Sequence, residues 1–154
     1  MERIENYEIT LDTAAIIGIN EKSTKIVENK KDYIINDNSY AVMEHSCEYF
    51  GSSYNGRCLG SKKMLGANYK VPIIVEESNE LIFFPISEIE KPGCIWISLK
   101  WFDKVVVDND TTYICLKNGK KIPTLISKYS IENQVLRSSK LHLILSERKK
   151  PKNY

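Results

Sequence analysis

Cysteine and histidine, the residues that most often act as nucleophiles or metal ligands, are few and scattered in this chain. The four cysteines are far apart in the sequence: Cys47, Cys58, Cys94 and Cys115. No C-x-x-C pair occurs, so a zinc ribbon is not expected, and buried thiols in a reducing cytosol explain the pattern better. His45 lies two positions before Cys47, so an enzyme that uses Cys47 or Cys58 as its nucleophile stays open as an alternative.

The motifs of nucleotide-dependent, dinucleotide-dependent and hydrolytic enzymes are missing from the sequence. The two histidines, His45 and His142, belong to different predicted elements. We therefore expect a protein that is not an enzyme, with no catalytic residue, no metal site and no cofactor.

Residue types that bind nucleic acid gather in two segments. The first combines hydroxyl, amide and basic groups between glycines: Ser52, Ser53, Tyr54, Asn55, Arg57, Lys62 and Lys63. The second falls on adjacent turns of a predicted C-terminal helix: Asn133, Gln134, Arg137 and Lys140. Asn and Gln recognise adenine edges, whereas Arg and Lys bind phosphates or enter a narrow minor groove. A chain turn and a helix cap are the purely structural interpretations of the same two segments.

The charge of the chain is distributed unevenly. The net charge is +2, yet residues 111–154 contain ten basic and two acidic side chains, which is a charge of +8. Clustered basic side chains attract polyanions, so double-stranded DNA is the expected partner. A solvated helix followed by a basic tail would have the same composition.

Hydropathy argues against a membrane partner. No run of eighteen apolar residues occurs, and the N-terminal residues include three glutamates rather than the apolar core of a signal peptide. We therefore expect a cytoplasmic protein.

Alternating apolar residues and turn signals predict many short antiparallel strands and hence an α+β fold. An N-terminal meander with one solvated face is predicted from four segments: 7–11, 14–19, 23–28 and 31–36. Later strands are predicted at 71–75, 81–84, 94–99, 104–107, 111–117 and 121–125. Asn118 and Gly119 indicate a hairpin between the last two.

Three helices are predicted between and after these strands. A short one covers 44–50 and ends at Gly51, and a second, weakened by Gly56 and Gly60, is capped by Ser52 or Ser53. The C-terminal helix is predicted to begin with Ser130 as its N-cap. Its apolar face contains Ile131, Val135, Leu141, His142, Ile144 and Leu145. We expect a single DNA-binding domain at 1–148 and a short basic tail at 149–154.

The residues from His45 to Arg57 resemble the S-C-x-[FY]-F-G-S-S-Y-x-G-R signature of the ComK family of competence transcription factors. The resemblance continues in the same order through 83–85, 92–98, 118–120, 126–127 and 130–137. It covers roughly residues 7–148, and a run of twelve matched positions is more specific than a single glycine motif.

The resemblance implies an activator of DNA-uptake genes that binds paired A/T-rich boxes from the minor groove. It also implies a homo-oligomer, a dimer or larger, that works with RNA polymerase and whose level is set by a Clp protease adaptor. Longer relatives have a C-terminal extension that the adaptor engages. This sequence stops at Tyr154, which leaves that control open. A second interpretation is an accessory or phage-type relative that binds DNA or protein without activating transcription.

Overall fold

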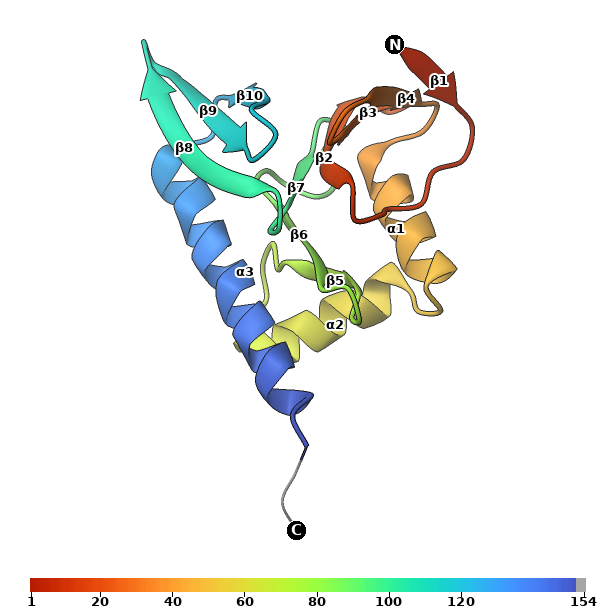
Figure 1. Cartoon of the computed structure of the whole chain (residues 1–154), viewed down its shortest axis with the longest axis vertical. Helices are drawn as coiled ribbons and strands as arrows, with labels where there is room; N and C mark the ends of the chain where they lie inside the picture. The colour runs from red at the N-terminus through yellow and green to blue at the C-terminus, as the bar shows by residue number, and fades with distance from the viewer. Residues whose placement is uncertain (152–154) are drawn as a thin grey trace.

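The computed structural model describes residues 1–151, which form two β-sheets and three helices (Figure 1). The larger sheet has seven strands in the spatial order β1 (Glu2–Ile4), β4 (Asp32–Ile35), β3 (Ser23–Glu28), β2 (Thr13–Asn20), β7 (Ile95–Ser98), β6 (Leu81–Pro85) and β5 (Ile73–Glu76). Neighbouring strands are antiparallel except β1 and β4, which are parallel.

The smaller sheet is an antiparallel meander of β8 (Phe102–Asp108), β9 (Thr111–Leu116) and β10 (Lys121–Thr124). The helices are α1 (Ser39–Tyr49), α2 (Tyr54–Leu65) and α3 (Lys128–Arg148). Figure 1 shows α3 along one side of the molecule, with the small sheet beside its beginning and α2 meeting its second half. The predicted α+β class with antiparallel sheets, central helices and a C-terminal helix is confirmed.

Apolar side chains cover both faces of the large sheet. Phe83 belongs to the cluster that contains Met43 of α1, whereas its neighbour Phe84 belongs to the cluster that contains Ile114 of the small sheet. Successive residues of a strand point to opposite faces, so β6 contributes to two cores at once. The solvated face predicted for the N-terminal meander is partly covered, because Ala15 and Val27 belong to the same cluster as Ile114.

The strands predicted from 14 to 36 are confirmed, but the strand predicted at 7–11 is wrong. Tyr7 and Ile9 are buried as the alternation suggests, yet their segment pairs with no strand. Side chains bind its backbone instead: the Ile9 N–H donates to Ser46 Oγ over 3.2 Å, and the Thr10 N–H donates to Thr13 Oγ1 over 2.9 Å. The alternation of apolar and polar residues at 7–11 therefore indicated which side chains are buried, but it did not indicate pairing with another strand.

Turn residues set the two hairpins of the small sheet. The predicted hairpin at Asn118 and Gly119 joins β9 to β10, with Gly119 in a left-handed conformation (φ +87°). Asn109 and Asp110 form the tighter turn between β8 and β9, also with positive φ. Positive φ at both turn residues matches the twist of the flanking strands.

Helix ends differ from the predictions at two N-termini. α1 begins at Ser39, five residues before the predicted start, because Asn38 Oδ1 accepts a hydrogen bond from the Ala41 N–H over 2.8 Å. The N-cap of α3 is Ser127, and the predicted cap Ser130 lies inside the helix. The Ser127 hydroxyl accepts a hydrogen bond from the Ser130 N–H over 3.1 Å, so α3 begins three residues earlier than predicted.

Candidate nucleic-acid interface

The first predicted segment forms the start of α2. Gly51 has a φ of +85°, which reverses the chain after α1. Ser53 is the N-cap of α2, and its hydroxyl accepts a hydrogen bond from the Gly56 N–H over 3.0 Å. Ser52 and Asn55 are exposed beside this cap. The free N–H groups and the dipole of such a helix end attract phosphate.

The outward face of α2 is exposed and contains two glycines. Asn55, Leu59 and Lys63 follow one another at four-residue intervals, and all three are exposed. Gly56 and Gly60 lie next to them, and a Cβ at Gly60 would touch nothing within 4 Å. Glycine inside a helix costs about 1 kcal/mol relative to alanine. No contact inside the protein requires glycine at position 60. The missing side chain leaves room for another molecule to approach the helix closely.

Arg57 lies at the side of this face and is bound internally. Its Nη1 atom donates to Glu77 Oε1 over 2.9 Å, and only 20% of the Arg57 side chain is exposed. Glu77 lies in the turn between β5 and β6, and its carbonyl accepts a hydrogen bond from Lys149 Nζ over 3.2 Å. The structure thus brings the signature segment and the basic end of α3 to one turn, although they are far apart in the sequence.

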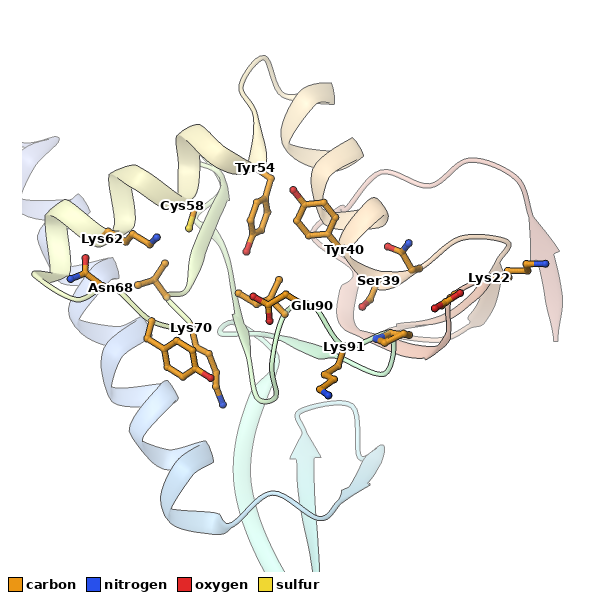
Figure 2. Close-up of a pocket in the computed structure, with 16 residues that line it drawn as sticks. Lys22, Ser39, Tyr40, Tyr54, Cys58, Lys62, Asn68, Lys70, Glu90 and Lys91 are labelled. Atoms are coloured by element: carbon orange, nitrogen blue, oxygen red, sulfur yellow. The ribbon is translucent and has the colours of Figure 1, made fainter.

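Two residues of the first segment point elsewhere. Tyr54 is 7% exposed and packs edge-to-face against Tyr40, with ring centroids 4.9 Å apart. Lys62 and Tyr54 both line a groove of about 790 Å³ between α1, α2 and three loops (Figure 2). The outward face of α2 therefore excludes Tyr54 and Lys62.

In the second predicted segment, Gln134 and Arg137 support a loop. The Gln134 amide donates to the Lys70 carbonyl over 2.8 Å and to the Pro85 carbonyl over 2.6 Å. Arg137 donates to the carbonyls of Tyr69 and Lys70 over 2.8 and 3.1 Å, and burial lowers the pKa of its guanidinium. Gln134 is only 6% exposed, so its amide is committed to the protein interior.

Asn133 and Lys140 remain exposed on the outer side of α3. Large exposed apolar side chains recur along α3 at seven-residue intervals: Tyr129, Leu136 and Leu143, which are 80%, 69% and 61% exposed. Two helical turns separate such positions, so they form one stripe along the helix. This stripe was not predicted, because only the apolar face expected to be buried was considered. The seven-residue spacing of its residues is nevertheless visible in the sequence.

Groove lysines were also missed. Lys22, Lys70 and Lys91 come from three loops, and they line the same groove as Lys62. No local pattern in the sequence connects these positions, and only the tertiary structure brings them together.

The enzyme interpretation finds little support in the geometry. Cys47 is fully buried, and burial raises the pKa of its thiol to about 11. A reactive cysteine needs the thiolate near neutral pH, which Cys47 does not supply. His45 binds Glu8 through Nε2 over 3.3 Å rather than a cysteine.

Comparison with known proteins identifies the family. The profile of the ComK protein family matches residues 4–150. The chain belongs to the ComK family. A ComK relative, the competence transcription factor of Bacillus subtilis (strain 168), is 34% identical over 151 residues, which cover 94% of this chain and 78% of the relative. No solved structure matches this ComK chain significantly. Within residues 1–151, no helix combines the length and hydropathy that a membrane span requires.

Proposed function

We propose that this protein is a transcription factor that binds A/T-rich DNA boxes and activates competence genes. Its membership of the ComK family and its similarity to a competence transcription factor support this role. The outward face of α2 is the structural observation that carries the proposal, because it combines an open helix N-terminus, exposed polar side chains and a glycine without internal contacts.

On this face, the N-terminus of α2 binds one phosphate through free N–H groups and the hydroxyls of Ser52 and Ser53. Lys63, at the other end of the helix, binds a second phosphate. Arg57 lies between them and enters the minor groove, where the negative potential of an A-tract is strongest. The absence of side chains at Gly56 and Gly60 allows close approach of the DNA backbone.

Basic residues at the end of α3 extend this surface. Arg148 is the last residue of α3 and Lys149 is its C-cap, and Lys149 borders the Glu77 turn that also holds Arg57. Lys150 is bound to Glu147 over 2.8 Å, and such an exposed pair opens at little cost. Lys152 of the predicted basic tail lies outside the described residues. We assign these side chains to phosphates outside the boxes, where they add affinity without sequence preference.

A gel-shift titration at several salt concentrations tests the proposal, with paired A/T-rich boxes and a G/C-rich duplex of equal length. Binding should prefer the A/T boxes and weaken steeply with salt. Lys63→Ala should flatten the slope of log affinity against log salt by about 0.9, because one phosphate is no longer neutralised. Lys104→Ala removes the same charge from an exposed position of β8 and should leave the slope unchanged. Equal slopes for both variants would contradict the assignment of α2.

We also propose that the protein forms a homodimer through the outer face of α3. The stripe of Tyr129, Leu136 and Leu143 is apolar and exposed, as expected of the contact face of a helix that packs against a second helix. We call this contact face the seam. In an antiparallel pair centred on Leu136, Tyr129 lies level with Leu143 of the second copy. The same register sets Glu132 level with Lys140 of the second copy, so opposite charges lie across the seam. A parallel pair would set like charges level with each other, so we assign the antiparallel one.

Activation needs contact with RNA polymerase, which distinguishes an activator from an accessory DNA-binding relative. Transcription from a promoter with paired A/T boxes, reconstituted with purified polymerase, should rise when the protein is added. DNA binding without a rise in transcription would favour the accessory role.

A further inference from the structure

The groove between α1 and α2 has the composition of a small-molecule site. Its wall on one side is aromatic and apolar, built from Tyr40 and Tyr54 with Val71 and Ile89. Asn38 and Ser39, at the N-terminus of α1, add polar groups to the rim. Its volume of about 790 Å³ lies within the range of pockets that enclose drug-sized ligands. Neither the proposed DNA surface on α2 nor the α3 stripe uses this space.

A hydrogen-bonding group without a partner points into the groove. The Tyr54 hydroxyl is buried, and it has no hydrogen-bond partner among the described residues. Figure 2 shows this hydroxyl directed into the cavity, away from the helix that supports it. Burial raises the pKa of Tyr54, so the group is a neutral donor at any physiological pH. A buried hydroxyl without a partner costs free energy, and a ligand acceptor would remove that cost.

The charge of the groove favours an anion. Four lysines line it, Lys22, Lys62, Lys70 and Lys91, against two carboxylates, Glu21 and Glu90. Within residues 1–151, none of these lysines forms an ion pair, whereas Lys70 lies 5.5 Å from the centre of the Tyr69 ring. Figure 2 shows the lysines spread around the groove. The α1 N-terminus adds a partial positive charge to the same rim.

We propose that this groove binds a nucleoside monophosphate. The base packs against Tyr40 and Tyr54 and accepts a hydrogen bond from the Tyr54 hydroxyl through a ring nitrogen or carbonyl. The ribose meets the polar rim, and the phosphate lies among Lys62, Lys70 and Lys91. The aromatic wall fits the base, the Tyr54 hydroxyl fits an acceptor on that base, and the lysines around the groove fit the phosphate, whereas a simple anion would leave the aromatic wall unused.

Titration of the full chain with AMP, GMP, CMP and UMP in the absence of DNA tests the assignment. Calorimetry measures the affinity, and tryptophan fluorescence reports occupancy, since Trp96 lies 6.1 Å from the Tyr54 ring. At least one nucleotide should bind with a Kd on the order of 10 µM. This affinity corresponds to the ordinary binding free energy per non-hydrogen atom for a ligand of this size. The matching nucleoside should bind about tenfold more weakly, because it lacks the phosphate.

Three variants distinguish binding in the groove from nonspecific attraction of the nucleotide to basic side chains elsewhere on the protein. Tyr54→Phe keeps the ring and should raise the Kd about fivefold, the usual effect of one neutral hydrogen bond. Lys62→Ala should raise it by a similar factor, and Lys104→Ala, on β8, should leave it unchanged. Thermal unfolding of each variant verifies that the fold is retained.

Failure of all four nucleotides to bind would overturn the assignment. So would equal affinities for nucleotide and nucleoside, or a Kd that Tyr54→Phe and Lys62→Ala both leave unchanged. Since the titration contains no DNA, its outcome is independent of the DNA-binding proposal, which the gel-shift experiment tests separately.

Discussion

Arg57 in α2 and Lys149 at the end of α3 bind the same residue, Glu77 in the turn between β5 and β6. Arg57 reaches the carboxylate over 2.9 Å, and Lys149 reaches the main-chain carbonyl over 3.2 Å. Both cations belong to the proposed DNA surface, so in the proposed complex DNA would compete with Glu77 for Arg57. The turn therefore couples the stability of the fold to the proposed DNA surface.

Arg57→Ala should destabilise the protein as well as change any DNA contact. The Arg57 side chain is largely covered, and the variant cannot form the ion pair with Glu77. We expect a decrease of about 1 kcal/mol in the free energy of unfolding, measured with urea. In a double-mutant cycle, Arg57→Ala should cost much less when Glu77 is already alanine. Additive effects would mean that the pair contributes nothing to stability.

Gln134→Ala should destabilise the fold more than it affects any DNA contact. The variant removes the Gln134 donor from the Pro85 carbonyl and leaves the Lys70 carbonyl with Arg137 alone, and an unpaired buried group costs about 1–3 kcal/mol. Asn133→Ala, at the exposed neighbouring position, should change the free energy of unfolding by less than about 0.5 kcal/mol. Urea unfolding compares the two variants. Equal, small effects would show that the Gln134 bonds are not needed to hold the loop.

Leu136→Lys should abolish self-association through α3. The symmetric pair brings Leu136 against its own copy, so two ammonium groups would meet at the centre of the seam. Sedimentation equilibrium should give a dissociation constant at least tenfold higher than that of the unmodified chain. Val107→Lys, an exposed apolar position of β8, should leave association unchanged. If the unmodified chain is a monomer at all concentrations, the seam is not an interface.

Glu80 should make stability depend on acidic pH. A hydrogen bond from His142 lowers the pKa of Glu80 below its ordinary value. The folded pKa is thus lower than the unfolded value of about 4.3, so the stabilisation is present above that pH and is lost as pH falls through the folded pKa. Glu80→Gln should be less stable than the unmodified chain at pH 6, and the difference should disappear as the pH falls below the folded pKa of Glu80.

Urea unfolding across this pH range measures that difference. Glu5→Gln serves as the control, because Glu5 is exposed. A difference for Glu80→Gln that stays constant from neutral to acidic pH would contradict the role of the His142 bond.

Local features were largely predictable from the sequence. Ser53 as a helix cap, the hairpin at Asn118 and Gly119, and the strands from 14 to 36 depend on contacts between residues close in the chain. Residue periodicity and capping chemistry report such contacts directly. The α+β class and the family signature followed from the same short-range information.

Tertiary structure alone decided what the polar side chains do. Gln134 has the chemistry to read adenine, yet packing sets its amide against the Pro85 carbonyl. Arg57 has the chemistry to enter a minor groove, and the β5–β6 turn supplies it with Glu77. A side chain binds whichever partner the fold brings within about 3 Å, and partners distant in the sequence leave no periodic signal. For that reason the sequence indicated which polar side chains are present, and the fold determined which of them remain free to bind a ligand.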